Sequence, residues 1–434
     1  MLRLAVPAML FGVLTQAFRS VDQFWVKDIS SAAQAAVGAS VFVVIAMFAL
    51  FELPALGAAP LIARATGGND PALRRRVLGA AIVANLLLCA GVMALVIPLA
   101  PTLAQWLGLR DAPARVFTAY VVALSATILP WAFTPLVDAS FVAMGNTRLP
   151  MKLHALALGL TLLLTPLFIY PVAGGIPGLG LGIAGAALSA NAARLLSCGL
   201  GFYALVADTE LRLADLRVGP ELRRVVRVGA PMSVGTLWYA GVYWFLLRTS
   251  VSPQGPHVNA ALGIGFSALE GVSWPAFHGI GLAVSSVVGR ALGAGRPDLA
   301  RAAIGLALPL STAAGFLAAA VFFFGGHELT GLFTEDPLIH ATATGYALAL
   351  AWSQPFVAWE TLAEGVLAGA GDTRTVAAWS MPLNFLRIPL AWILSFPLGW
   401  GPAGVWWAIN LTSFAKALGK GSSALRGGWV DTEV

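Results

Sequence analysis

Six acidic side chains lie inside long apolar segments of this sequence, where a free charge is costly. On insertion scales each charged group at the centre of a membrane costs about 2.5–3.5 kcal/mol, so each acid must be paired, hydrated or protonated. A carboxylate in such a place can bind and release a proton or a metal cation. The six candidates are Asp22, Glu52, Asp138, Glu270, Glu360 and Glu364.

The first candidate site is the pair Glu360 and Glu364, which are four residues apart and so share one helix face. Two buried carboxylates this close cannot easily both ionise, so one is expected to hold a proton near neutral pH. Arg387, in the middle of the next apolar segment, is the expected partner for one of them. The alternative is a purely structural ion pair.

The second candidate is Asp22, which follows Arg19 by three residues on the same predicted helix face. From the spacing alone two interpretations stay open: an internal salt bridge, or a coupling-ion site at Asp22 whose charge Arg19 tunes. Asp138 precedes Glu364 by 226 residues, the offset of a repeat described below, which favours a shared gate or packing role. Glu52 has no sequence-level partner.

A substrate site is predicted around Glu270. A carboxylate and aromatic faces hold an organic cation in a dry cavity. His278, two turns farther along, could relay protons or could be a hydrogen-bonded helix contact. The aromatic candidates, which could instead be membrane-interface anchors, are Trp238, Tyr239, Tyr243 and Trp274.

The composition places these residues in a membrane protein. The chain has 434 residues, of which 58% are hydrophobic and only 11% charged, and its mean hydropathy is +0.82. Soluble domains carry about 25% charged residues. Only two cysteines, Cys89 and Cys198, are present, and both lie in apolar runs, which excludes a disulfide scaffold.

Twelve apolar segments are long enough to cross a bilayer, which needs about 20 residues. The fold class is therefore an all-α membrane protein with twelve transmembrane helices. Asp70-Pro71 and Asp336-Pro337 each predict a capped helix start. The segments are approximately 4–26, 36–62, 77–100, 114–143, 150–172, 179–206, 225–248, 259–289, 301–324, 338–369, 375–397 and 401–419.

The basic residues set the orientation. Twenty of the 26 Lys and Arg fall on the side of the N-terminus, Lys416 and Lys420 counted among them, and four fall on the other side. By the positive-inside rule both termini are cytoplasmic, in the plasma (inner) membrane, and no cleaved signal is needed. The net charge of +6 therefore reflects topology and lipid headgroups rather than nucleic acid.

The chain is an internal repeat of six plus six segments. Residues 63–71 (ARATGGNDP) match 289–297 (GRALGAGRP), and 145–148 (GNTR) match 371–374 (GDTR), both at an offset of 226. An even number of segments separates the copies, so the pseudo-two-fold axis runs along the membrane normal. The predicted organisation is an N-lobe, 1–206, a cytoplasmic linker, 207–224, a C-lobe, 225–420, and a short tail, 421–434.

On these motifs the chain resembles the multidrug and toxic compound extrusion (MATE) family over nearly its whole length. Further matches are VDQFWV at 21–26, SALEG at 267–271 and GAGDTR at 369–374. The resemblance is closer to the prokaryotic branch that includes the DNA-damage-inducible members. It implies two six-helix lobes and an antiporter that exports organic, commonly cationic, compounds in exchange for protons or sodium, with Asp22 as a coupling-ion residue.

One departure from the family bears on the coupling ion. Many relatives carry an asparagine and an aspartate in the fifth segment, where this chain has Thr161 and Thr165 before Pro166. Protons are therefore favoured over sodium.

Other functions are disfavoured by the motifs. Residues 180–185 and 399–404 satisfy the dinucleotide fingerprint GxGxxG, but a lipid span cannot contain the βαβ unit that it needs. The chain has no Walker A motif and no metal-ligand cluster, so no enzyme activity and no cofactor beyond H+ or Na+ are expected. A monomer is expected. Two alternative functions to the antiporter are a lipid-linked oligosaccharide flippase of the same superfamily and an intramembrane enzyme.

Overall fold

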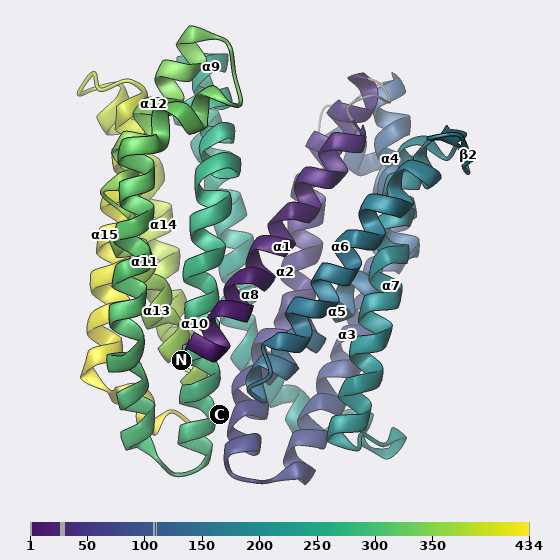
Figure 1. Cartoon of the computed structure of the whole chain (residues 1–434), viewed down its shortest axis with the longest axis vertical. Helices are drawn as coiled ribbons and strands as arrows, with labels where there is room; N and C mark the ends of the chain where they lie inside the picture. The colour runs from purple at the N-terminus through teal and green to yellow at the C-terminus, as the bar shows by residue number, and fades with distance from the viewer. Residues whose placement is uncertain (1, 27–30, 107–108, 110, 434) are drawn as a thin grey trace. The chain divides into compact units, whose positions relative to one another are not determined.

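The structure is a computed structural model. It describes residues 2–26, 31–106, 109 and 111–433, and the side chains of residues 16–39, 41–42, 112–113 and 268 fall outside the description. The described chain is almost entirely helical (Figure 1). It divides into two compact units. The first comprises residues 14–65 and 70–233, and the second comprises residues 1–13, 66–69 and 234–434.

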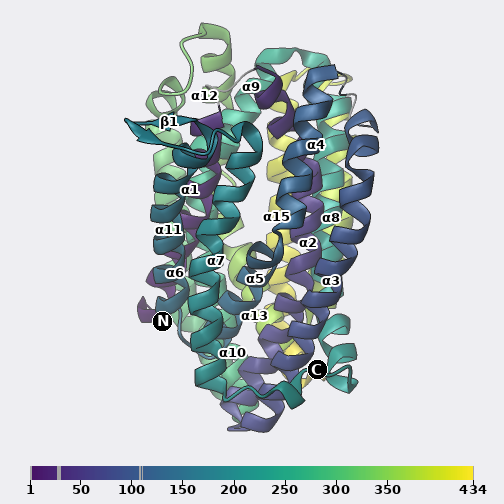
Figure 2. The same cartoon turned by 90° about the vertical axis from the view of Figure 1, so that its right-hand side faces the viewer.

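The first unit is built from the helices that follow α1, Leu2–Val26. A short hairpin, β1 (Val172–Ala173) with β2 (Ile176–Pro177), joins two neighbouring helices, α6 and α7 (Figure 2). A 3-10 turn, Leu213–Asp215, follows α7. The helices are α2 (Ser31–Gly67), α3 (Pro71–Trp106), α4 (Asp111–Ala126), α5 (Leu129–Ala143), α6 (Arg148–Ile169) and α7 (Gly182–Thr209).

The second unit begins within α8, Pro220–Leu246, and contains two π-helical turns, Leu247–Val251 and Gly265–Glu270. Short 3-10 turns occupy Ser252–Gln254 and Gly428–Asp431. The remaining helices are α9 (Pro256–Ile264), α10 (Gly271–Gly293), α11 (Pro297–Gly331), α12 (Pro337–Ala351), α13 (Gln354–Ala370), α14 (Thr373–Ser395) and α15 (Pro402–Arg426).

The all-α membrane fold is confirmed, and each predicted segment falls on one helix or on an interrupted helix. The fourth and tenth segments are interrupted at equivalent places, just before Pro130 and Pro355. Proline lacks the N–H that would continue the preceding helix, and it is tolerated in the first turn of the next one, where both prolines lie. In the first of these the two halves meet at a bend of 53°. Within the described residues six helices, and a seventh if that bent pair counts as one, are long and apolar enough to cross a membrane.

The predicted helix starts are confirmed at both Asp-Pro pairs. The carboxylate of Asp336 accepts hydrogen bonds from the backbone N–H groups of Leu338 and Ile339, at 2.8 and 3.1 Å. Asp70 accepts one from the N–H of Leu73 at 2.8 Å. These contacts satisfy N–H groups that have no partner within the helix, so each cap fixes where its helix begins.

Glycines allow the closest helix packing of the second unit, between α10 and α13. A Cβ on Gly365 would lie 2.3 Å from the carbonyl oxygen of Gly281, and one on Gly369 would lie 2.4 Å from that of Ser285. Membrane helices associate through such small-residue contacts, because lipid supplies no hydrophobic drive between them. The packing holds α13, which carries Glu360 and Glu364, against α10.

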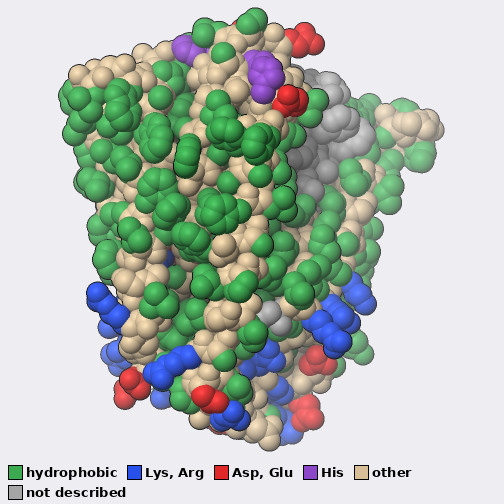
Figure 3. All heavy atoms as spheres, turned by 60° about the vertical axis from the view of Figure 1, so that its left-hand side comes forward, with side chains coloured by type: hydrophobic (Ala, Val, Ile, Leu, Met, Phe, Trp, Pro, Cys, Tyr) green, Lys and Arg blue, Asp and Glu red, His purple; other side chains and the backbone are tan. Residues whose placement is uncertain are grey.

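The outer surface shows how a membrane would surround this face. Hydrophobic side chains cover its middle, and Lys and Arg side chains gather at its lower end (Figure 3). Two basic residues assigned above to the cytoplasmic side do not belong there. Lys416 and Lys420 lie within α15 and are buried. The 20 basic residues assigned to the cytoplasmic side therefore include two that lie in the protein interior.

Candidate functional site

The second unit holds a four-residue cluster of charges between α13 and α15, in which Glu360, Lys416 and Lys420 are buried and the side chain of Glu364 is 33% exposed. The Oε1 atom of Glu360 lies 3.1 Å from Nζ of Lys416 and 2.9 Å from Nζ of Lys420. Lys420, which is 1% exposed, also contacts Oε2 of Glu364 at 2.5 Å. Two acids four residues apart thus face two lysines four residues apart. The cluster is neutral overall, which a buried group of charges requires.

This arrangement differs from the predicted one in both its partners and its charge. Arg387 is not in ion-pair contact with either glutamate: its Nε donates to the hydroxyl of Thr412 at 3.0 Å and its Nη1 to the hydroxyl of Tyr243 at 2.8 Å. The glutamates are separated by ammonium groups rather than paired with each other. The signal that sequence reasoning missed is the i, i+4 spacing of Lys416 and Lys420 inside an otherwise apolar segment.

Glu270 stands in a different environment within the same unit. It ends the π-helical turn before α10, and its Oε1 accepts a 2.6 Å hydrogen bond from the hydroxyl of Tyr346. Such turns occur frequently at functional sites. No described lysine, arginine or histidine lies within 4.0 Å of its carboxylate. Glu270 is therefore an acid held by a neutral donor, and Tyr346 is a neighbour that the sequence did not reveal.

The predicted aromatic residues fall into two groups. Tyr239 and Tyr243 lie together, with ring centres 4.6 Å apart, and Tyr243 connects them to Arg387, whose guanidinium carbon lies 5.4 Å from its ring centre. Trp274 and His278 stack on each other along α10, with ring centres 4.8 Å apart.

Trp238 makes a contact of another kind. Its indole N–H donates to the backbone oxygen of Met381 at 2.9 Å, and its side chain is 39% exposed. It is thus a contact between α8 and α14. Asp22 and Arg19 belong to α1, but their side chains lie outside the described residues, so their predicted pairing and coupling role stay a prediction.

The first unit buries one acid with a different partner. Oδ2 of Asp138, on α5, lies 2.8 Å from Nε2 of His154, on α6. The other ring nitrogen of His154 lies 3.4 Å from the hydroxyl of Thr15, on α1. Both members of the pair are buried, at 7% and 8% exposed. Sequence reasoning did not find His154; the signal for it was a histidine inside the fifth apolar segment, and its partner lies on another helix.

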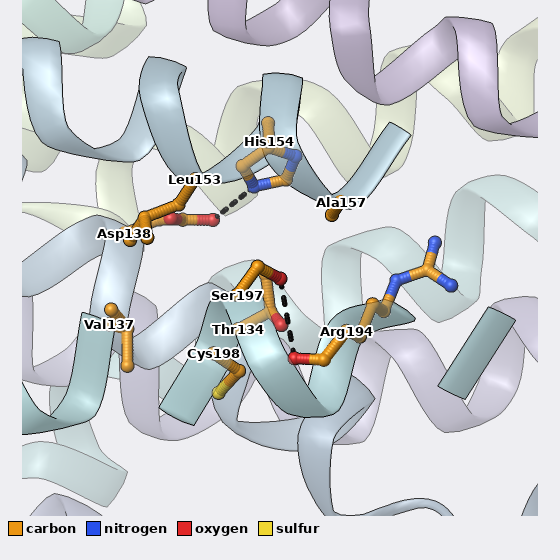
Figure 4. Close-up of a pocket in the computed structure, with 9 residues that line it drawn as sticks. All are labelled: Thr134, Val137, Asp138, Leu153, His154, Ala157, Arg194, Ser197 and Cys198. Atoms are coloured by element: carbon orange, nitrogen blue, oxygen red, sulfur yellow. Dashed lines mark hydrogen bonds and ion pairs between the residues drawn. The ribbon is translucent and has the colours of Figure 1, made fainter. Parts of the chain in front are cut away.

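A small cavity of about 10 Å³ adjoins this pair, large enough for about one water molecule. Figure 4 shows Asp138 and His154 pointing toward each other at one side of it. The nine residues that line it are Thr134, Val137, Asp138, Leu153, His154, Ala157, Arg194, Ser197 and Cys198.

The fifth segment contains hydroxyls where relatives carry stronger ligands. The hydroxyl of Thr161 donates to the backbone oxygen of Ala157 at 2.9 Å, and that of Thr165 lies 3.1 Å from the hydroxyl of Ser189. Both threonines are fully buried. Each hydroxyl therefore serves the packing of its own unit, and neither position supplies a carboxylate.

Comparison with known proteins decides the family. The MatE family model matches this chain twice, over residues 7–167 and over residues 231–393. This chain belongs to the MATE family. The double match also confirms the internal repeat, because the two matched regions end 226 residues apart, the offset of the loop motifs.

Curated MATE relatives match over nearly full length. The probable multidrug resistance protein NorM of Bradyrhizobium diazoefficiens is 28% identical over 442 residues, covering 96% of this chain and 90% of that protein. The protein of the same name from Thermotoga maritima is 24% identical over 418 residues, covering 94% of this chain and 87% of that protein.

Solved structures share the fold. An outward-facing multidrug resistance MATE transporter of the MOP superfamily superposes with a TM-score of 0.91 at 20% identity, covering 99% of this chain and 95% of that one. A MOP superfamily transporter from Pyrococcus furiosus, described as having a binding pocket of reverse polarity, superposes with a TM-score of 0.90 at 19% identity, over 100% and 96% of the chains.

The family membership settles the class of protein. The chain is a multi-pass membrane transporter of the MATE multidrug efflux family, with small molecules as substrates, and it is not an enzyme. MATE transporters of this fold work by alternating access, of which an outward-facing state is one stage.

Proposed function

We propose that this MATE transporter exports organic cations in exchange for protons, and that Glu270 is the carboxylate at which the two compete. The observation that carries the proposal is the environment of Glu270, an acid whose close partner is the neutral hydroxyl of Tyr346. An acid locked to a lysine has little reason to take up a proton. An acid held by a phenol does, because no cation in ion-pair contact keeps it charged in the low-dielectric interior.

The neighbours of Glu270 suit a cationic substrate. Tyr243 and Phe266 lie with ring centres 5.2 Å apart, and Tyr239 packs against Tyr243. An organic cation is attracted both to a carboxylate and to aromatic faces. Arg387, which is buried beside Tyr243, disfavours a second positive charge there and limits the site to one cation at a time.

The exchange follows from charge balance. When Glu270 is protonated it no longer attracts the cation, which leaves, and when Glu270 is ionised its negative charge attracts a cation. Each bound species stabilises the conformations that bind it better, which is how a gradient of one can drive the other. Protons are favoured over sodium because Thr161 and Thr165 supply no carboxylate in the fifth segment.

The flippase alternative requires a basic cavity for a pyrophosphate group. The second unit does bury Arg387, Lys416 and Lys420, but both lysines are in ion pairs with Glu360 or Glu364. The lysines therefore offer no free positive charge to a phosphate, and a cation exporter remains the better reading of the site.

The experiment is efflux of a fluorescent organic cation from proteoliposomes containing the full chain. An imposed pH gradient should drive efflux and a sodium gradient alone should not. Glu270→Gln keeps the shape and the acceptor for Tyr346 but cannot ionise, so gradient-driven efflux should fall at least about tenfold, as expected for loss of a charge-assisted interaction worth about 1.5–3 kcal/mol.

The matched control is Glu328→Gln, the same change at an exposed acid near the end of α11, which should leave efflux unchanged. Efflux driven by sodium alone would contradict proton coupling. Normal pH-driven efflux in Glu270→Gln would remove Glu270 from the site.

We also propose that the protein lies in the plasma (inner) membrane as a monomer, with both termini in the cytoplasm. The surface distribution of Lys and Arg at one end of the second unit supports this orientation (Figure 3). A cysteine introduced in the 145–148 loop should then react with a membrane-impermeant reagent only from the cytoplasmic side.

A further inference from the structure

The Asp138 and His154 pair of the first unit has no part in the function proposed above, yet it is a buried acid with a titratable partner. The two side chains come from different helices, α5 and α6, and approach to 2.8 Å. Histidine is the side chain whose charge changes most readily between about pH 5 and pH 8.

The geometry defines two states of the pair that differ by one proton. With Nε2 facing the carboxylate, neutral His154 donates its Nε2–H to ionised Asp138, and the pair has a net charge of −1. When a proton from water bonds to Nδ1, the pair becomes an imidazolium and a carboxylate, with net charge zero. Burial favours the neutral state, because an uncompensated charge in the interior is costly.

Thr15 is suited to both states. Its hydroxyl lies 3.4 Å from Nδ1 of His154, and a hydroxyl can either donate or accept a hydrogen bond. In the proton-free state the hydroxyl donates to Nδ1, and in the proton-bound state Nδ1–H donates to the hydroxyl. The switch thus reverses a hydrogen bond between α6 and α1, so the proton state is communicated to a second helix.

Other ionisable groups near the pair come from α7. Arg194 and Cys198 line the same cavity, whereas α1 contributes the uncharged Thr15 among the described residues. The guanidinium of Arg194 is directed away from the pair (Figure 4), and its Nη1 lies 3.5 Å from the backbone oxygen of Ala190. Among the described residues, Arg194 is thus not in ion-pair contact with Asp138, and His154 is the group that is.

A water molecule in the adjoining cavity would lie beside the pair and would exchange protons with it. The cavity has room for about one water molecule, and Thr134 and Ser197 are among the residues that line it. His154 is six residues into α6, about 9 Å along the helix from the loop that precedes it, at the 1.5 Å rise per residue of an α-helix. The pair therefore lies nearer the 144–147 end of the unit than the hairpin end.

We propose that Asp138 and His154 form a second proton-binding site, separate from Glu270, that exchanges its proton at the 144–147 end of the first unit. Binding of the proton is a property of the pair itself, while its contribution to transport rests on the proton antiport proposed above. A transporter with such a site in each unit would move more than one proton per substrate cation.

The test of proton binding is an NMR titration of the full chain in detergent with ¹⁵N-labelled histidine. The chain has five histidines, and the resonance absent from His154→Gln identifies His154. It should change from the neutral to the imidazolium form between about pH 5 and pH 9. In Asp138→Asn, which removes the carboxylate, the transition should move at least about one pH unit toward acid.

The matched control is Lys152→Gln, an exposed charge two residues earlier on α6, which should leave the transition in place. A His154 resonance that does not change over this range, or one that titrates identically in Asp138→Asn, would overturn the proposal. Asp138→Asn also serves if His154→Gln fails to fold, because the resonance it shifts is then the one that belongs to His154.

Transport measurements test the role of His154 in efflux separately from its ability to bind a proton. In proteoliposomes His154→Gln should lower pH-driven efflux severalfold and reduce the number of protons moved per cation, obtained from the reversal potential. If wild-type efflux ignores the pH gradient while His154 titrates, proton antiport fails and the binding site stands. If wild-type efflux follows the pH gradient but the His154 resonance does not change with pH, the proposed second site is rejected and proton antiport is retained.

Discussion

The two units carry equivalent acids but give them different partners. Asp138 and Glu364 occupy the same place in the repeat, 226 residues apart. In the first unit the acid contacts His154, whereas in the second it contacts Lys420. Lysine remains charged throughout the physiological range and histidine does not. One unit thus contains a fixed ion pair where the other contains a pair that can respond to pH.

The partners come from different helices, so the difference is not a simple substitution. By the match of Asn191 with Asn410, the counterparts of Lys416 and Lys420 are Ser197 and Gly201. Neither can pair with an acid as a cation. Glu360 corresponds to Thr134, whose hydroxyl donates to the backbone oxygen of Pro130 at 2.7 Å. The two copies of the repeat therefore share an acid at this position, but the residues that pair with it differ.

The packing of the units differs in the same direction. Gly281, Gly365 and Gly369, which bring α10 and α13 together, correspond to alanines in the first copy. Closer helix approach and permanent charge pairing both favour a rigid second unit around Glu360 and Glu364. Equivalent acids in the two copies of a repeat, such as Asp138 and Glu364, can therefore have different roles.

The largest effect should follow from breaking the fixed cluster. Lys420→Met removes the ammonium that contacts both Glu360 and Glu364, leaving Glu364 without a close cation. Loss of one member of a buried ion pair costs about 3–5 kcal/mol, so the melting temperature in detergent should fall steeply. The loss should be partly restored by the double change Lys420→Met with Glu364→Gln.

The comparison control for this cluster is an exposed pair. Arg296 and Asp298 lie 2.8 Å apart at the surface, with side chains 55% and 61% exposed, and Asp298→Asn should leave the melting temperature unchanged. If Lys420→Met is as harmless as Asp298→Asn, the cluster does not stabilise the second unit and the contrast between the units is lost.

A smaller effect is expected from widening the contact between α10 and α13. Gly365→Ala would place a Cβ 2.3 Å from the carbonyl oxygen of Gly281, and overpacking of this kind costs about 1–3 kcal/mol. The melting temperature should drop, less than in Lys420→Met. Gly305→Ala, on α11, has no atom within 4 Å of the added carbon and should be neutral or slightly stabilising.

The smallest change in stability, and the sharpest test of the contrast, comes from exchanging the two kinds of partner. His154→Lys keeps a cation beside Asp138 but fixes its charge, so fewer protons should move per cation than in the wild type, while the pH dependence that comes from Glu270 remains. Stability should change less than in Lys420→Met, because a cation still neutralises Asp138.

The reciprocal exchange is Lys420→His in the second unit. A histidine beside Glu360 and Glu364 is stabilised in its charged form, so its stabilising contribution is present at acid pH and is lost as the pH rises. The melting temperature of Lys420→His should therefore fall from about pH 6 to pH 8, where that of the wild type stays level. Equal pH dependence in both proteins would mean that the nature of the partner does not matter.

The sequence predicted the membrane class, the helical segments, the repeat and the family, and it located the acids. These follow from composition and spacing, because a bilayer permits few structures and because an acid in an apolar helix stands out. It predicted the wrong partner for the Glu360 and Glu364 pair. Arg387 was chosen because it lies in the next apolar segment, whereas Lys416 and Lys420 were assigned to the cytoplasmic side. It also passed over His154 and Tyr346, whose importance depends on the helix that each faces.

What the amino-acid sequence determined by itself is therefore which charges enter the membrane. What the tertiary structure alone decided is which of those charges are neutralised, by what, and how reversibly. The physical reason is that the free-energy cost of burying a charge depends on residue type and local hydropathy, and both can be obtained from the sequence. The compensation depends on a contact of about 3 Å between side chains of different helices, as between Asp138 and His154 or Glu364 and Lys420, and that distance is fixed only when the helices pack.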